Sequence, residues 1–98
     1  MNVIARRTLK AFWERHAAAK GPIQAWHQVA RKAQWQSPAE IKLQFGTTVD
    51  FLPENRVVFD LAGNRYRLVA KLNYPLKIVF VRFIGTHAEY DKIDAETI

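Results

Sequence analysis

The stretch IGTHAEYDKID, at residues 84–94, places three side chains that can move protons or hold charge within five positions. They are the imidazole of His87, the phenol of Tyr90 and the carboxylate of Asp91. The tetrapeptide THAE at residues 86–89 fits a capping box, which predicts that a helix starts at His87. Because residues three and four positions apart share one side of a helix, the three side chains are expected to lie together.

Two interpretations of this stretch stay open. Taken alone, His87 is an ordinary exposed residue at a helix start, and Tyr90 is a core aromatic. In the functional interpretation, the positive end of the helix attracts an anion and disfavours a charged imidazole, although Asp91 opposes that effect. A neutral imidazole beside a phosphate is suited to accept a proton.

The elements that must position this stretch are three predicted strands, each rich in β-branched or aromatic residues. Their sequences are RVVFDL, RYRLVAKL and KIVFVRFI, at residues 56–61, 65–72 and 77–84. The dipeptide Gly63-Asn64 is typical of a two-residue hairpin turn between the first two strands. The three strands therefore predict an antiparallel meander that ends just before the THAE helix start.

The turn lengths predict which residues face each other. A two-residue first turn pairs Asp60 with Arg67, and a four-residue second loop pairs Leu72 with Lys77. Arg67 then lies opposite Arg82, and like charges in that position cost stability. One interpretation is an exposed sheet surface with an Asp60–Arg67 ion pair worth under about 1 kcal/mol. The other is an anion site whose charge repulsion is relieved by a bound phosphate.

Strand alternation divides the meander into two faces. The face predicted to form the core is apolar throughout: Val57, Phe59, Leu61, Tyr66, Leu68, Ala70, Leu72, Val79, Val81 and Phe83. The second face mixes charged and apolar residues: Arg56, Asp60, Arg65, Arg67, Lys71 and Arg82, with Val58, Val69, Ile78, Phe80 and Ile84.

The N-terminal part of the chain predicts helices that cover the core face. Residues 2–5, NVIA, predict a short strand, and residues 6–20 predict an amphipathic helix that Gly21-Pro22 breaks. A second helix follows, with one apolar side: Ile23, Trp26, Ala30 and Ala33. Two amphipathic helices joined by a tight break form a helical hairpin.

A third helix is predicted from the sequence SPAE at residues 37–40, with Ser37 as N-cap and proline in the first position. It runs through about Leu43, and residues 46–55 are predicted to be loop. The whole pattern predicts an α+β fold in a single domain over residues 1–98.

Positive charge is concentrated in the first third of the chain. The net charge is +6, and residues 6–32 hold seven basic residues and one acidic residue, whereas the remainder is balanced. This one-sided distribution predicts a polyanionic partner such as nucleic acid, and the alternative is that the charge only keeps the protein soluble. The chain has no cysteine, which excludes disulfide and thiolate chemistry. Without a membrane-length apolar run or a signal-peptide core, we expect a cytoplasmic protein with no membrane partner.

The other histidines and the tryptophans predict structural roles. His16 lies on the apolar helical stripe and is expected in the core, whereas His27 is expected to be solvated. Trp13 and Trp26 fit core packing, and Trp35 fits either packing or base stacking. The histidines are scattered and no HExxH motif occurs, so no metal and no other cofactor is predicted.

The chain resembles the HigB toxins of bacterial type II toxin–antitoxin systems, within the wider RelE/ParE superfamily. The resemblance rests on the opening strand with its basic helical hairpin, on AGNRYRLVA at residues 62–70 and on IGTHAEYD at residues 84–91. The order of elements matches over essentially the whole chain. The resemblance implies a RelE-like fold: a small, mostly antiparallel sheet of an N-terminal strand and the meander, packed on the helical hairpin.

The resemblance further implies a ribosome-dependent endoribonuclease, or mRNA interferase. It implies that a helix-turn-helix, HigA-like antitoxin holds the toxin inactive, and that the toxin contacts DNA only indirectly, through this antitoxin. Superfamily members place a basic residue on the second meander strand, matching Arg67. They place a basic residue or histidine after the last strand, matching His87, and a tyrosine near the C-terminus, matching Tyr90. His87 is expected to act as base or acid, Tyr90 as its partner or orienter, and Arg67 as charge stabiliser assisted by Arg82. Attack by the RNA's own 2′-hydroxyl needs these groups and no metal.

Further cations are expected to contact the ribosome and RNA. They are Arg6, Arg7, Arg15, Lys20, Lys42, Arg56, Arg65 and Lys71. Other superfamily members carry additional basic or histidine residues before the first meander strand, where this chain has only Lys42 and Arg56. Two other functions stay open: a non-enzymatic inhibitor of gyrase, as in the ParE branch, and an RNA- or ribosome-binding module without catalysis.

Overall fold

The computed structural model describes residues 1–4 and 6–98, except for the side chain of Arg6. Ala5, at the end of the predicted NVIA strand, and the predicted RNA contact of the Arg6 side chain lie outside the described residues. The elements follow in the order β1 (Asn2–Ile4), α1 (Arg6–Arg15), the 3-10 helix η1 (Ala17–Ala19), α2 (Lys20–Lys32), α3 (Pro38–Phe45), the 3-10 helix η2 (Gly46–Thr48), β2 (Val49–Leu52), β3 (Arg56–Leu61), β4 (Tyr66–Asn73), β5 (Ile78–Thr86) and α4 (His87–Tyr90).

The described strands form one five-stranded sheet in the order β1-β5-β4-β3-β2. β1 pairs in parallel with β5, and the other neighbours are antiparallel, which confirms the predicted α+β class with an N-terminal strand beside the meander. The prediction of loop over residues 46–55 was wrong for β2, which pairs along β3 as an edge strand. Only Val49 of this short strand is fully buried, so it lacks the apolar alternation that marks a strand in sequence.

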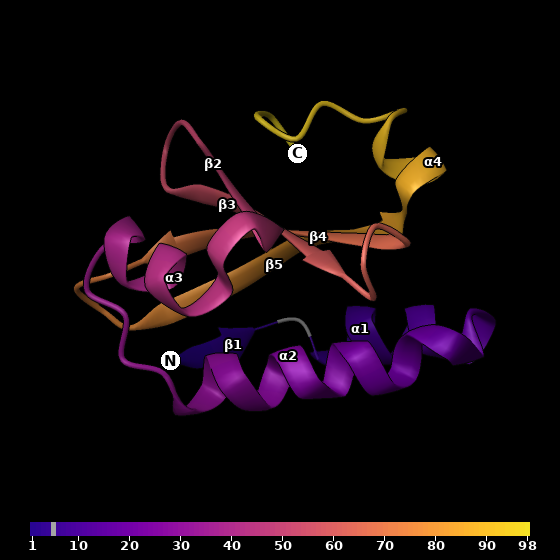
Figure 1. The fold of residues 1–98 in the computed structure, drawn as a ribbon, viewed down its shortest axis with the longest axis horizontal. Helices are drawn as coiled ribbons and strands as arrows, with labels where there is room; N and C mark the ends of the chain where they lie inside the picture. Colours follow the sequence, from indigo (N-terminus) through magenta and orange to yellow (C-terminus); the bar gives the residue numbers. More distant parts are fainter. Residues whose placement is uncertain (5) are drawn as a thin grey trace.

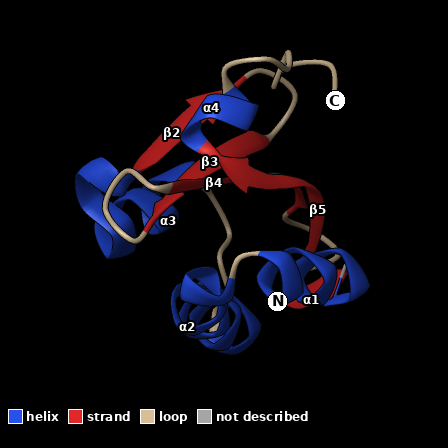
Figure 2. Cartoon of the chain, turned by 90° about the vertical axis from the view of Figure 1, so that its right-hand side faces the viewer, coloured by secondary structure: helices blue, strands red, loops and turns tan. Residues whose placement is uncertain are grey.

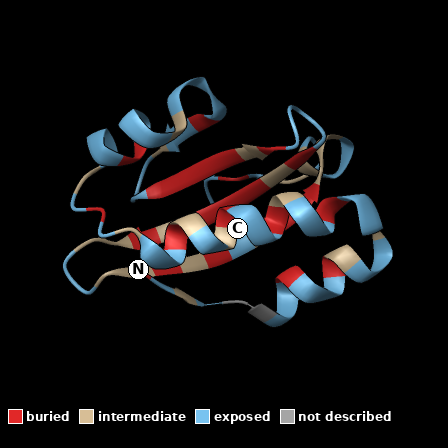
Figure 3. Ribbon diagram, turned by 60° about the horizontal axis from the view of Figure 1, so that its bottom comes forward, coloured by how far each residue is buried: buried red, intermediate tan, exposed pale blue. Residues whose placement is uncertain are grey.

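The helices and the C-terminal segment lie on opposite sides of this sheet. In Figures 1 and 2, α1 and α2 lie together on one side, and α4 with the chain that follows it lies on the other. The helical side holds the main core, in which α1, α2 and α3 contribute apolar side chains to the sheet. Figure 3 shows buried turns along α1 and α2, with largely buried strands behind them.

The helical hairpin turns at a different place from the one predicted. α1 ends at Arg15, and His16 leaves the helical conformation with φ −128° and ψ 81°. Gly21-Pro22 lies inside α2, in its first turn, rather than between the helices. Proline is tolerated there because the first turn of a helix needs no N–H donors for intrahelical bonds.

The start of α3 lies where it was predicted, with Ser37 as an extended N-cap and Pro38 in the first position, but the Ser37 side chain makes no capping hydrogen bond. The helix continues to Phe45, beyond the expected end near Leu43. Glu40 accepts a hydrogen bond from the backbone of Gln36 at 2.9 Å, so it stabilises the entry to the helix one residue before the N-cap.

The first hairpin has the predicted register, with Asp60 opposite Arg67. The second register was wrong: Leu72 pairs with Val79 rather than Lys77, and Arg67 faces Gly85 rather than Arg82. β4 runs on through Asn73 before the turn, and a bulge shifts the register again between Val69 and Ala70.

The bulge also exchanges two residues between the faces of the sheet. Val69 pairs with Phe83 and Ala70 with Val81, so Arg82 is the extra residue of β5. Ile84 consequently joins the main core, and Phe83, predicted in that core, packs on the second face. The rest of the predicted core face is found in the main core.

The second face is covered at its centre by the C-terminal segment, residues 91–98. Val58 and Val69 from the sheet are buried with Ala95, and Ile93 and Ile98 pack against them. Arg56 is only 5% exposed, and its guanidinium donates to the backbone carbonyl of Ile98. The interpretation of this face as an open, solvated surface is therefore wrong near Val58 and Val69.

Candidate functional site

The predicted capping box forms where β5 passes into α4. Thr86 Oγ1 accepts from the backbone N–H of Glu89 at 3.2 Å, and Glu89 Oε1 accepts from the backbone N–H of Thr86 at 2.8 Å. The backbone N–H of His87 donates to the carbonyl of Arg65 at 3.0 Å, which ties the helix start to the β3–β4 hairpin. These bonds fix the position of His87 relative to the second meander strand.

Gly85 allows this close passage of strand and helix. It lies opposite Arg67 in the β4–β5 pair, and it is buried. A Cβ atom at this position would collide with the ring of Phe83 and press on the Cβ of Glu89. The glycine therefore permits the Phe83 ring to fold under the start of α4.

Arg67 lies at the centre of the site. Its Nε is 3.3 Å from Asp60 Oδ1, an ion pair whose angles fall outside those of a hydrogen bond. Its Nη2 donates to Asn64 Oδ1 at 3.1 Å and lies 3.4 Å from His87 Nε2. Its Cζ lies 4.9 Å from the centre of the Tyr90 ring. The predicted convergence of Arg67, His87 and Tyr90 is thus present in the structure.

The contacts of His87 define which nitrogen carries its proton. Nδ1 lies 3.1 Å from Asp91 Oδ2, and a carboxylate only accepts, so Nδ1 carries the hydrogen. Nε2 faces Arg67, which only donates, so Nε2 is the acceptor. This pair of contacts turns Nδ1 toward Asp91 and Nε2 toward the arginine, and the side chain remains 42% exposed to an incoming substrate.

Tyr90 is half-buried beneath the guanidinium of Arg67. Its ring is 6.4 Å from the ring of Phe83, and it packs on the small cluster of Val58 and Val69. The sequence left open whether Tyr90 is a core aromatic or a member of the site. The structure shows both features, because the ring packs in a small core and also lies against the guanidinium of Arg67. A cation over an aromatic face is attracted by the ring quadrupole, which favours the role of orienter.

Electrostatics at the helix start favour negative charge. A backbone hydrogen bond from Thr86 lowers the pKa of Glu89 below its usual range, and the hydroxyl of Thr86 and the nearby His16 and Arg15 add to the effect. The cationic end of α1 therefore lies close enough to α4 for its charges to act on the site. An anion that binds beside His87 would experience the same positive surroundings.

The other predicted site residues are dispersed. Arg82 is exposed in the bulge, and three strand residues, or about 10 Å, separate it from the position opposite Arg67. Lys71 is half-buried at the far end of β4, and Lys42 is exposed on α3. Arg56, another predicted RNA contact, is buried under the C-terminal segment, where its guanidinium donates to the carbonyl of Ile98.

Two contacts of the site were missed from sequence. Asn64 was identified only as a turn residue, but its side-chain oxygen holds Arg67. The signal was present, since Asn64 comes three residues before Arg67 across a hairpin end. The covering of the second face by residues 91–98 was also missed, although Ile93, Ala95 and Ile98 are apolar residues in an otherwise polar end.

The remaining aromatic residues are mostly structural. His16 is half-buried and stacks on Phe12 with ring centres 4.5 Å apart, close to the predicted core role. Trp26 and Trp35 are buried around Phe59, so packing is the correct alternative for Trp35.

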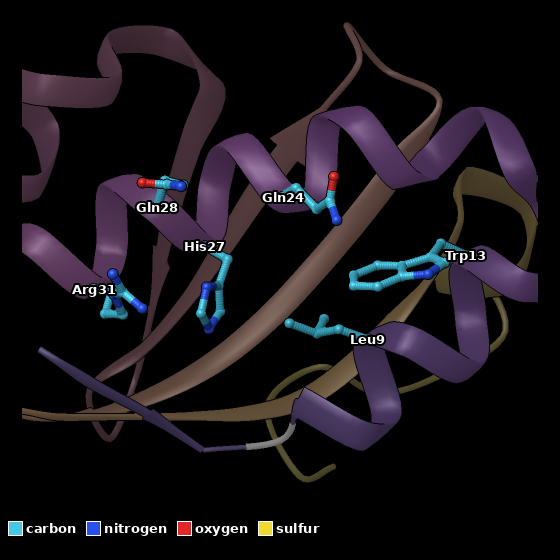
Figure 4. Close-up of a pocket in the computed structure, with 6 residues that line it drawn as sticks. All are labelled: Leu9, Trp13, Gln24, His27, Gln28 and Arg31. Carbon is cyan, nitrogen blue, oxygen red and sulfur yellow. The ribbon is translucent and has the colours of Figure 1, made fainter.

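One cavity lies between α1 and α2, with a volume of about 350 Å³ (Figure 4). His27, predicted to be solvated, is half-buried in its lining, and Trp13 is half-buried beside it. The residues that line this cavity come from α1 and α2, and neither Arg67 nor His87 is among them.

Among residues 1–4 and 6–98, no group of three or more histidine or acidic side chains gathers in a way that could hold a metal ion. No helix in the described part of the chain is long and apolar enough to cross a membrane.

A basic helical layer on one side of a small sheet, with a histidine–arginine–tyrosine site at the end of its last strand, is a RelE-like toxin architecture. Residues 19–93 match the family model of the HigB toxin, described as the RelE-like toxic component of a toxin–antitoxin system. The chain therefore belongs to the HigB toxin family.

Curated relatives agree with this assignment. The chain is 27% identical over 94 residues to the mRNA interferase HigB of Escherichia coli O6:H1, covering 95% of this chain and 91% of that protein. It is 27% identical over 92 residues to the mRNA interferase HigB of Shigella flexneri, covering 93% and 88% of the two chains.

Proposed function

We propose that this toxin is an endoribonuclease that cuts mRNA on the ribosome, without a metal, through attack by the RNA 2′-hydroxyl. The observation that carries the proposal is the position of His87, which is held between Asp91 at 3.1 Å and Arg67 at 3.4 Å with Nε2 facing the guanidinium. The names of the relatives, mRNA interferases, support the same reaction class.

The geometry supports a division of roles. In the free protein Arg67 Nη2 donates toward His87 Nε2, so the base is occupied. A phosphate that binds the guanidinium would take over that donor, and Nε2 would then be free to accept the proton of the 2′-hydroxyl. The 2′-oxygen attacks the adjacent phosphorus, Arg67 stabilises the charge that develops there, and the 5′-oxygen leaves with a proton from solvent.

Partners of the toxin follow from the family and from its charge. The family places it in a toxin–antitoxin system, and we propose a helix-turn-helix, HigA-like antitoxin as the inhibitory partner. Exposed cations along α1 and α2, such as Arg7, Arg15 and Lys20, suit the phosphates of ribosomal RNA. A cytoplasmic location is part of the same proposal.

The test is induction of the toxin without an antitoxin, followed by mapping of mRNA ends. We expect growth arrest, with cuts in ribosome-bound mRNA and far fewer cuts in free RNA. Cleavage by the purified protein with ribosomes should persist after the toxin has been treated with a chelator and returned to buffer that supports the ribosome. Growth arrest with intact mRNA and gyrase trapped on DNA would establish the inhibitor function instead.

A further inference from the structure

We propose that the cavity between α1 and α2 is a pocket for one unstacked base, best matched by adenine, of the structured RNA on which the toxin docks. The inference rests on the proposed function only for the presence of that RNA. The pocket would add a second contact with RNA that takes no part in the reaction. This contact recognises a base, whereas the positive charge of the helices recognises only phosphates.

The lining of the pocket has the chemistry of a base site. Trp13 and Leu9 reach from α1 toward α2, and Gln24 and His27 reach back from α2 (Figure 4). Leu9 is buried and closes the floor, whereas Trp13 is half-buried and keeps part of its ring accessible. An aromatic ring beside amide side chains matches how proteins hold unstacked bases.

The exposed side chains at the rim can read the edge of a base. Gln24 and Gln28 are exposed, and their spacing puts both on one side of α2. A glutamine amide can donate to the N7 of adenine and accept from its N6 amine at the same time, which other bases do not match as well. This pairing is the reason for the adenine preference in the proposal.

The charge around the pocket selects RNA over a protein segment. Lys20 and Arg31 lie on the same side of α2 as Gln24, and both are exposed. Eleven residues of helix separate them, or about 16 Å, so cations lie at both ends of the pocket. Residues 6–32 carry seven basic residues against one acidic residue, which suits a phosphate backbone running over the mouth of the pocket.

The pocket is lined by residues of α1 and α2, and no residue of the Arg67–His87 site is among them. We therefore assign the base in the pocket to the RNA on which the toxin docks rather than to the strand being cut.

The experiment measures binding of a short RNA hairpin that carries 2-aminopurine in an adenine loop, with a blunt duplex of equal length as the reference. The full chain carrying His87→Ala is used, so that the probe is not cut. We expect the hairpin to bind more tightly than the duplex, with quenching of the 2-aminopurine fluorescence. Trp13→Ala should weaken hairpin binding about 5- to 150-fold, the range for loss of one base–aromatic stack.

Matched variants separate base contact from charge and from folding. Trp13→Phe keeps a ring and should retain most of the affinity, whereas Gln24→Leu should remove the preference for an adenine loop over a uridine loop. Lys20→Ala should reduce the slope of the logarithm of the binding constant against the logarithm of the salt concentration by about 1. Trp13→Ala should leave this slope unchanged. If Trp13→Ala does not fold, Gln24→Leu carries the test because its side chain is exposed.

Equal binding of hairpin and duplex, or wild-type hairpin binding by Gln24→Leu and by folded Trp13→Ala, overturns the proposal. Loss of antitoxin capture by these variants with unchanged RNA binding overturns it too, and makes the groove a protein-binding site. Cleavage of mRNA by the wild type is measured in parallel. A failure of cleavage with intact hairpin binding would refute the proposed function and leave the pocket established.

Discussion

Arg67 contacts more members of the candidate site than any other described residue, and each contact restrains a different part of its side chain. Asp60 holds Nε, Asn64 and His87 share Nη2, and the ring of Tyr90 supports the guanidinium plane. Such a preorganised cation needs little rearrangement when charge develops on a phosphate. The arrangement also links the cation to the proposed base. When a phosphate accepts the hydrogen bond from Arg67 Nη2, that hydrogen bond is no longer made to His87 Nε2, and Nε2 can accept another proton.

The first prediction concerns the two residues for which we propose direct roles in the reaction, His87 and Arg67. His87→Ala and Arg67→Ala should each lower mRNA cleavage about 10²-fold or more, the usual scale for loss of one acid–base or charge-stabilising group. Both variants should stay folded and bind the antitoxin. Cleavage rates and thermal melting are measured on the same preparations, with the exposed Lys92→Ala as the control for lost positive charge beside α4. If His87→Ala cleaves mRNA at the rate of the wild type, residues 84–94 are only a well-capped helix start and His87 has no role in the reaction.

The second prediction concerns Asp91, whose carboxylate lies 3.1 Å from His87 Nδ1 and which we expect to orient that ring. Asp91→Ala should lower the cleavage rate roughly 10-fold or more by releasing the ring, while the affinity for ribosomes stays the same. Single-turnover rates and ribosome binding are compared with those of Glu96→Ala, an exposed acid in the same segment. A weaker affinity with an unchanged rate would mean that Asp91 serves docking rather than orientation.

At the scale of residues, local rules predicted the site better than its surroundings. The capping box and the first hairpin register bring His87 and Arg67 together, and both follow from fixed spacings of a few residues. The burial of Arg56 could not be predicted, because it depends on where the C-terminal segment lies over the sheet. The position of the C-terminal segment depends on contacts between residues far apart in the sequence, which a short sequence pattern does not predict.

The bulge at Arg82 is the element that most changes the site from its predicted form. Two small differences, a strand continued through Asn73 and one extra residue in β5, move Arg82 away from Arg67 and turn Phe83 under Tyr90. Lys77, with φ 58°, takes a left-handed conformation that glycine or asparagine usually occupies, so the turn is not recognisable from its residues. Most core positions of the meander were nevertheless predicted correctly, because apolar residues alternate along each strand whatever the exact register between strands.

The third prediction concerns the helix cap. Thr86→Ala removes the acceptor for the Glu89 N–H and should lower the free energy of unfolding by about 1 kcal/mol. Cleavage should fall much less than for His87→Ala, because the backbone bond from His87 to Arg65 remains. Chemical denaturation of the two variants checks the difference. A loss of cleavage as large as that of His87→Ala, without loss of stability, would show that the hydroxyl acts in the reaction.

The fourth prediction is a pH dependence of the same cap. The pKa of Glu89 is lowered in the folded chain from its ordinary value of 4.5, chiefly by the Thr86 backbone hydrogen bond. The carboxylate therefore contributes stability that is complete above pH 4.5 and is lost as the pH falls through the lower, folded value. The melting temperature of the wild type should decline more steeply below pH 4.5 than that of Glu89→Gln. Parallel curves for the two proteins would contradict the assignment.

At the scale of the whole molecule, most of the positive charge lies on α1 and α2, on the side of the sheet opposite α4. The end of α1 at Arg15 and His16 nevertheless lies close enough to α4 to lower the pKa of Glu89.

The fifth prediction concerns the cations of α1 and α2. Changing Arg7, Arg15 and Lys20 together to glutamate should weaken ribosome binding and flatten its salt dependence. Folding should survive because all three side chains are exposed. Binding is titrated over a salt series, with Lys92→Glu as the control on the other side of the sheet. If ribosome binding is unchanged, the positive charge of α1 and α2 serves solubility or binding of the antitoxin instead.

The pairing of β1 with β5 also has a consequence for how the toxin is made. The first strand completes the sheet only beside the last one, with Asn2 opposite Ile78, and the site residue His87 follows that last strand. Contacts between the ends of a chain form late and slowly, since the intervening loop must close before they are gained. During synthesis β1 therefore has no partner in the sheet until β5 has been made, and the proposed base His87 is added only after β5. A nascent chain that stops before residue 78 thus contains neither a complete sheet nor the candidate site.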